Sequence, residues 1–118
     1  MIITAQSGTT PWSYAPPSTG IVNTTTAVTI KAATTGQRNY ITDLHIAHST
    51  LGAAVELGIR DGAAGTVIFR TAMNVTANDG QTISLKTPLF SSVGTLLEVV
   101  LSGATTGGVY VNAQGFSA

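Results

Sequence analysis

AVELGIRDGAAGTVIFRTAM, residues 54–73, is the stretch that decides the fold. Successive side chains of a β-strand point to opposite faces, and here Val55, Leu57 and Ile59 alternate with charged or small residues. The chain then passes through Asp-Gly at 61–62, a dipeptide typical of hairpin turns, into a second run rich in β-branched and aromatic residues. We therefore predict two antiparallel strands joined by a hairpin.

Segments of the same kind recur along the chain from residue 27 onward. Short runs rich in Val, Ile, Thr, Tyr and Phe are separated by glycine-bearing turns, which is the pattern of an all-β domain. Apolar residues at helical spacing are not sustained anywhere, so no helix is predicted. The spacing of the short β-type segments fits a single antiparallel β-sandwich. The predicted strands are 27–33, 39–49, 54–60, 66–73, 81–86, 96–102 and 109–115.

The residue pattern of the strands also predicts how some of them are packed and which charges they pair. Strand 96–102 has one apolar face and a second face, that of Glu98, that is largely apolar, so we expect it to be central and covered on both sides, or to face a partner subunit. Glu98 and Glu56 alternate with apolar residues, and a cross-strand arginine is the usual companion of such a carboxylate. Arg60 and Arg70 are the candidates. Asn-Asp-Gly at 78–80 predicts a further turn, which with the hairpin gives an antiparallel meander in the middle of the chain.

The first 26 residues have a different character. Residues 1–26 hold three of the four prolines and the only tryptophan, without helical or strand periodicity, and they predict an extended N-terminal arm beside a sandwich domain of residues 27–118. Prolines favour extended backbone. The arm either folds back over an open edge of its own sandwich or reaches onto a neighbouring molecule. The candidate partner-binding residues are Trp12, Tyr14, Pro16 and Pro17.

The composition limits the kinds of partner. Only 8% of the residues are charged, the formal net charge is zero, and 43% are hydrophobic, whereas an ordinary domain is about a quarter charged. A surface so poor in charge is weakly protected against association, so we expect self-association or packing in a larger assembly. The five scattered basic residues argue against binding nucleic acid, and no apolar run is long enough for a membrane helix.

Residues capable of chemistry are few. His45 and His48 resemble a metal-binding pair, but residues three apart on a strand face opposite ways. Asp43 and His45 share a face beside many hydroxyls, yet no Gly-x-Ser-x-Gly nucleophile elbow is present. Asp61 and Asp79 are explained as turn residues. We therefore expect no enzyme, cofactor or metal site, although loop oxygens could still hold calcium.

A resemblance is found between 39 and 117. The phrases IRDG at 59–62, VIFR at 67–70, PLF at 88–90, LLEVVLSGA at 96–104 and VYVNAQGF at 109–116 resemble small structural proteins of tailed bacteriophages, particularly capsid decoration or cement proteins. The resemblance implies a jelly-roll-like β-sandwich, commonly a homotrimer, seated on the outer capsid where major capsid subunits meet.

Composition and resemblance together predict a structural virion protein that stabilises seams between major capsid subunits. Its expected partners are the major capsid protein and further copies of itself, with no direct nucleic-acid or membrane contact. The expected location is the outer capsid surface, after synthesis in the host cytoplasm. Two alternatives stay open: a phage tail or neck component, and a virion-borne carbohydrate- or receptor-binding module.

Overall fold

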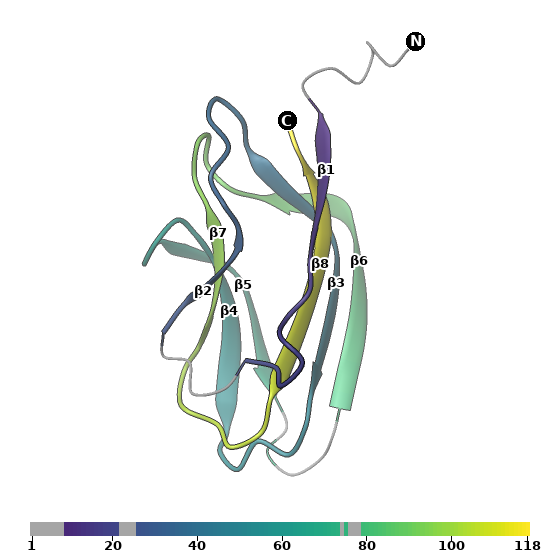
Figure 1. Ribbon diagram of the computed structural model, residues 1–118, viewed down its shortest axis with the longest axis vertical. Helices are drawn as coiled ribbons and strands as arrows, with labels where there is room; N and C mark the ends of the chain where they lie inside the picture. Colours follow the sequence, from purple (N-terminus) through teal and green to yellow (C-terminus); the bar gives the residue numbers. More distant parts are fainter. Residues whose placement is uncertain (1–8, 22–25, 74, 76–78) are drawn as a thin grey trace.

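Two antiparallel four-stranded sheets face each other in the computed structural model, which describes residues 9–21, 26–73, 75 and 79–118 (Figure 1). One sheet has the order β1-β8-β3-β6 and the other β2-β7-β4-β5. Within the described residues no helix forms, and hence none that would cross a membrane. The strands are β1 (Thr10–Tyr14), β2 (Val28–Lys31), β3 (Asn39–His48), β4 (Val55–Asp61), β5 (Thr66–Met73), β6 (Asp79–Phe90), β7 (Leu97–Leu101) and β8 (Val109–Ser117).

The strand order is that of a jelly roll. Every connection between consecutive strands crosses from one sheet to the other, except the hairpin between β4 and β5. Eight strands wound this way into two sheets form the jelly-roll arrangement of two Greek keys. The predicted all-β, jelly-roll-like sandwich is therefore confirmed, and so is the hairpin at residues 61–65.

The predicted meander is wrong beyond that hairpin. β6 pairs with β3 in the opposite sheet and not with β5. This pairing lets Ile83 and Leu89 of β6 pack against the core. Asp79 already belongs to β6, and Asn78 of the predicted turn lies outside the described residues.

The predicted arm contains a strand of the sandwich. β1 pairs antiparallel with β8 from Thr10↔Ser117 to Tyr14↔Ala113. This pairing gives the outer side of β8 a hydrogen-bonded neighbour, as the fold-back alternative expected. Trp12 and Tyr14, which alternate along β1, pack against the core. β1 is therefore part of the sandwich, although it lies before the domain boundary predicted at residue 26. Residues 1–8 and 22–25 of the predicted arm lie outside the described residues.

The core lies between the sheets and follows the alternation of the sequence. β7 is buried on both sides except at Val100, which is partly buried, because it lies between β2 and β4. This fits the prediction of a central, covered strand. β3 departs from simple alternation by a bulge between Ile41 and Asp43. The buried apolar residues include Ile41, Leu44, Ile46, Leu57, Ile59, Leu97, Val99, Leu101, Val109 and Val111.

Candidate binding surfaces

Three aromatic rings stand side by side on the outer face of the β1-β8-β3-β6 sheet. Tyr40 of β3 lies opposite both Phe90 of β6 and Phe116 of β8. The Tyr40 and Phe116 rings are stacked, with centroids 4.6 Å apart and planes 12° apart, and the Tyr40 and Phe90 centroids are 5.7 Å apart. We call these three residues the aromatic ladder. The Phe90 ring is tilted by 41° relative to the Tyr40 ring.

The ladder lies at one end of the sandwich, where two large apolar side chains are exposed. Phe90 is 48% exposed, and Val93 in the loop after β6 is 56% exposed. Among the described residues these are the exposed large hydrophobic side chains. The Arg38 guanidinium carbon lies 5.1 Å from the Phe90 ring centroid, and Arg38 Nη1 donates a hydrogen bond to the Ser91 carbonyl at 3.1 Å. We call the ladder with Arg38 and Val93 the aromatic end.

Buried Asn39 holds the loops of the aromatic end in place. Its Nδ2 donates to the carbonyls of Ala32 and Thr95, at 3.0 and 3.1 Å. Its Oδ1 accepts from the hydroxyl of Ser117 at 2.6 Å and of Thr34 at 3.2 Å. A buried amide that is fully bonded specifies one local arrangement. Asn39 therefore fixes β3, β8 and the loops after β2 and β6 relative to one another.

A groove crosses the same outer face next to the ladder. It consists of two adjoining hollows of about 390 and 270 Å³, which share Gln114 of β8. Pro11, Trp12 and Ser13 bring β1 to the first hollow. We call the two hollows together the outer groove. Its remaining lining residues are Thr42, Asp43, Leu44, His45, Thr82, Asn112 and Gly115.

Hydroxyl groups hold the ionisable residues of the outer groove. Asp43 Oδ1 accepts a hydrogen bond from Ser84 Oγ at 3.1 Å, and Asp43 Oδ2 accepts one from Thr42 Oγ1 at 2.9 Å. His45 Nδ1 lies 2.8 Å from Thr82 Oγ1. Asp43 and His45 thus share the outer face, as predicted. Neither of these two hydrogen bonds of the Asp43 carboxylate comes from His45, so the orienting carboxylate–imidazole bond of a catalytic triad is not made.

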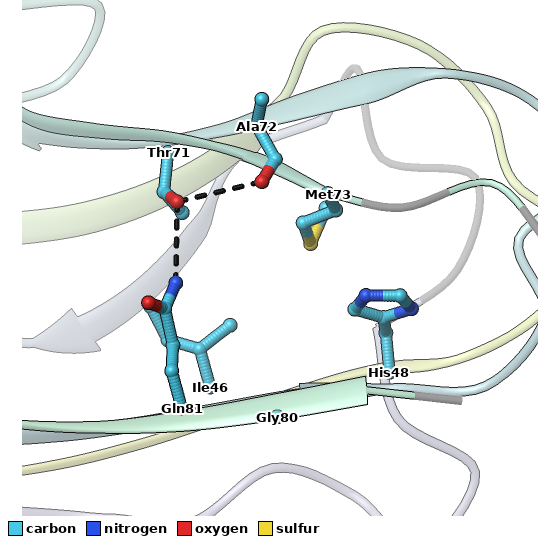
Figure 2. Close-up of a pocket in the computed structure, with 7 residues that line it drawn as sticks. All are labelled: Ile46, His48, Thr71, Ala72, Met73, Gly80 and Gln81. Atoms are coloured by element: carbon cyan, nitrogen blue, oxygen red, sulfur yellow. Dashed lines mark hydrogen bonds between the residues drawn. The ribbon is translucent and has the colours of Figure 1, made fainter. Parts of the chain in front are cut away.

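A second opening lies between the sheets, where the edge strands β5 and β6 meet (Figure 2). This slot has a volume of about 270 Å³. Figure 2 shows Met73 of β5 opposite His48 of β3, while Gln81 Nε2 donates across the slot to Thr71 Oγ1 at 3.2 Å. His48 is 7% exposed, and its Nδ1 lies 2.9 Å from the Ser49 carbonyl oxygen. Since a carbonyl oxygen only accepts, Nδ1 of His48 carries a proton.

The two histidines face opposite sides of the sheet, as the sequence predicted. His45 is exposed in the outer groove, and His48 is buried next to the slot. One ion therefore cannot contact both side chains within this sheet. In the part of the chain that the structure describes, no group of three His, Cys, Asp or Glu residues is placed to hold a metal ion.

The predicted partner-binding residues lie on or just after β1. Trp12 and Tyr14 are partly buried against the core, and burial raises the pKa of the Tyr14 hydroxyl above its ordinary value of 10.0. Trp12 Nε1 is buried and makes no hydrogen bond with the described residues. Pro16 is partly buried and Pro17 is exposed. Both rings cover the chain's own core, and partner binding by these four residues stays a prediction.

The carboxylates of the other sheet are paired as expected. Arg60 Nε donates to Glu98 Oε2 at 2.7 Å, and the same oxygen accepts from the backbone N–H of Ala64 at 3.0 Å. Arg70 Nε lies 3.7 Å from Glu56 Oε1 in an exposed pair. Asp61, predicted as a turn residue, ends β4 at the hairpin, and its carboxylate accepts from the Ser92 backbone N–H and hydroxyl at 2.9 and 2.7 Å.

The aromatic end was not predicted from the sequence. Tyr40 lies in the predicted strand 39–49, whereas Phe90 and Phe116 lie beyond the ends of the predicted strands 81–86 and 109–115. One signal was available in the sequence. The alternation in Asn39–His48 and Val109–Ser117 places Tyr40 and Phe116 on the face of their strands that points away from the buried residues. That signal does not give the cross-strand register, and the register is what brings the rings together.

Comparisons with known proteins give a likeness of fold. No protein-family model and no curated protein matches the chain. A chain of the cyanophage Pam1 capsid is similar at 16% identity and a TM-score of 0.47, over 92% of this chain and 82% of that one. The tobacco streak virus coat protein is similar at 12% identity and 0.44, over 95% and 88%. A carbohydrate-binding module of Cellvibrio mixtus lichenase 5A, in complex with cellotriose, is similar at 14% identity and 0.41, over 95% and 88%.

Two of these three structures are viral capsid or coat proteins, and the third binds a sugar. At such identities and TM-scores the likenesses carry no argument about what this chain binds. The jelly-roll assignment therefore rests on the strand order, and the functional argument rests on the surfaces described above.

Proposed function

We propose that the chain is a non-catalytic structural protein of a tailed-phage particle, a decoration or cement protein that docks on the capsid through its aromatic end. The observation that carries the proposal is that the exposed large hydrophobic side chains of the described residues, Phe90 of the ladder and Val93 three residues later, both belong to the aromatic end. Exposed apolar groups gathered in one place mark interaction sites, and buried aromatic residues supply much of the energy of protein interfaces.

The aromatic end is prepared for such a contact. The ladder rings restrain one another, and the bonds of Asn39 restrain the loops. Little conformational entropy is therefore lost when a partner covers these residues. Association of three copies presents three aromatic ends to one capsid lattice, and multivalency raises the overall affinity above that of a single contact.

Binding through the aromatic end is expected to depend weakly on salt. Arg38 supplies the positive charge of the aromatic end. Its guanidinium lies over the Phe90 ring and donates a hydrogen bond to the Ser91 carbonyl. Apolar burial does not weaken when salt screens charges, whereas attraction between exposed charges does. We expect similar binding at about 0.1 M and about 1 M NaCl, concentrations at which the Debye length falls from about 10 to about 3 Å.

Co-sedimentation with capsids stripped of this chain tests the proposal. The chain is expected to sediment with the capsids at both salt concentrations, and light scattering behind size exclusion is expected to give a trimer. Phe90→Ser should abolish sedimentation, whereas the control Val67→Ser, on the other sheet, should leave it intact. Failure of the unaltered chain to bind, release by salt, or binding by Phe90→Ser would each overturn docking through the aromatic end. A few copies per particle in place of hundreds would instead indicate a tail or neck component.

A further inference from the structure

We propose that the outer groove binds a neutral oligosaccharide, a function separate from docking on the capsid. The groove lies on the sheet face beside the aromatic end. Its lining includes two amides, several hydroxyls, one carboxylate and one imidazole, together with the apolar residues Pro11 and Leu44. These groups supply both donors and acceptors. A sugar hydroxyl needs both, because it donates one hydrogen bond and accepts others.

Two amide side chains of the groove are available for a ligand. Asn112 is partly buried and Gln114 is exposed, and both project from β8 on the outer face. Within the part of the chain that the structure describes, neither side chain makes a hydrogen bond. Each amide offers two N–H donors and one carbonyl acceptor. A vicinal pair of sugar hydroxyls matches that combination.

The neighbouring groups on β3 are already oriented. Ser84 and Thr42 each donate to one oxygen of Asp43, so the carboxylate is held in one orientation while it keeps further acceptor sites. The contact of His45 Nδ1 with Thr82 directs Nε2 away from that hydroxyl. A site with fixed groups loses less entropy when it binds.

The register arranges these groups in two rows across the sheet. Asp43 lies opposite Gln114, and His45 lies opposite Asn112. Residues on one face of a strand are two steps apart, or roughly 6.8 Å. Each row can therefore contact a different unit of one oligosaccharide. Pro11, which is exposed on β1 and lines the adjoining hollow, adds an apolar surface for the C–H groups of a further unit.

The charge of the groove selects the class of sugar. Asp43 is the carboxylate of the lining, and no Lys or Arg lines either hollow. A sialylated or sulfated glycan would place an anion near that carboxylate, with no cation of the lining to compensate it. Neutral glycans avoid this cost. The chain as a whole carries no net charge that would attract an anion.

A panel of immobilised trisaccharides tests the inference with the full-length chain. The panel contains neutral glucose, galactose and N-acetylglucosamine trisaccharides, together with sialylated trisaccharides. We expect binding to at least one neutral trisaccharide and none to the sialylated ones. Asn112→Ala and Gln114→Ala should each weaken binding about tenfold, which corresponds to the loss of one hydrogen bond. The matched control is Gln81→Ala, because the Gln81 amide faces the slot and not the groove.

The outcomes separate this inference from the proposed function. Absence of binding across the neutral trisaccharides would overturn the groove proposal, and so would binding that Asn112→Ala and Gln114→Ala leave unchanged. Preference for sialylated trisaccharides would overturn the argument from Asp43. Capsid co-sedimentation by Gln114→Ala is expected to stay intact, so either proposal can fail while the other stands.

Discussion

The outer faces of the two sheets use charge in opposite ways. On the β2-β7-β4-β5 sheet, four of the ten charged side chains form two ion pairs, Arg60 with Glu98 and Arg70 with Glu56. On the β1-β8-β3-β6 sheet, Asp43 and His45 contact hydroxyl groups instead of opposite charges, and the aromatic ladder and the amides of Asn112 and Gln114 lie beside them. The first face satisfies its own polar groups, whereas the second leaves rings and amides for a partner.

The contrast extends to how closely the backbones approach. Gly115 of β8 lies under Trp12 and against the Tyr40 carbonyl, so the strands meet closely beside the aromatic ladder. A Cβ at Gly58 of β4 would make ordinary van der Waals contacts with Val67 and Val100. The backbones of the β1-β8-β3-β6 sheet therefore approach closely at Gly115, whereas the other sheet leaves space for a side-chain carbon at Gly58.

The largest effect is expected from Gly115→Ala. The new Cβ would overlap the Tyr40 carbonyl oxygen and lie 3.1 Å from Trp12 Cζ2, so β8 would have to move away from β3. We expect the free energy of unfolding to fall by about 3 kcal/mol, measured by urea denaturation.

Gly58→Ala is the matched control for that substitution. Its Cβ would lie 3.6 Å from Val67 Cγ1 and 3.8 Å from Val100 Cγ1, which is ordinary contact. Because alanine restricts the unfolded chain, a stabilisation of about 0.5 kcal/mol is expected. Equal effects of the two substitutions would show that the sheets do not differ in tightness.

A smaller effect is expected from Glu98→Ala. Glu98 is 5% exposed and accepts hydrogen bonds from Arg60 and from the backbone N–H of Ala64. Ala64 lies in the hairpin and has a φ of 54°, in the left-handed region. Removing the carboxylate leaves the partly buried Arg60 guanidinium without its ion-pair partner, and the hairpin loses the hydrogen bond at the Ala64 N–H. We expect a loss of about 2 kcal/mol in thermal or urea unfolding.

The exposed pair on the same face provides the comparison. Glu56→Ala removes a carboxylate that is 55% exposed and contacts Arg70, which is 61% exposed, and we expect the free energy of unfolding to change by less than about 0.5 kcal/mol. If Glu56→Ala destabilised the chain as much as Glu98→Ala, burial would not be what distinguishes the two ion pairs.

Most of the fold could be predicted because each strand carries its own evidence. In Val55–Asp61 the alternation alone indicates which residues face the core, and the glycines after Asp61 mark the hairpin. β1 was not predicted as a strand, since only Trp12 and Tyr14 of its five residues face the core and prolines flank them. Its partner β8 is about a hundred residues away, and local sequence does not reveal such a pairing.

The candidate site was less predictable for the same reason. The aromatic ladder joins residues from three strands, and β3 carries a bulge that changes which of its residues face outward. Alternation within Asn39–His48 cannot place that bulge. For Glu98 and Glu56 the sequence indicated only that Arg60 and Arg70 are candidate partners, and the register of β4 and β7, which places Arg60 opposite Glu98, assigns the buried pair.

The smallest effect concerns Tyr14 of β1 and the stability of the chain at alkaline pH. Burial raises the pKa of its hydroxyl above 10.0 in the folded chain, so the unfolded chain releases this proton first. Stability is therefore unaffected below pH 10 and falls as the pH rises through that value, since the folded state then binds more protons than the unfolded state. Tyr14→Phe, followed by urea denaturation between about pH 8 and about pH 11, should remove this part of the pH dependence. An unchanged alkaline slope would mean that the Tyr14 hydroxyl is as well hydrated as in the unfolded chain, and that β1 does not cover this end of the core.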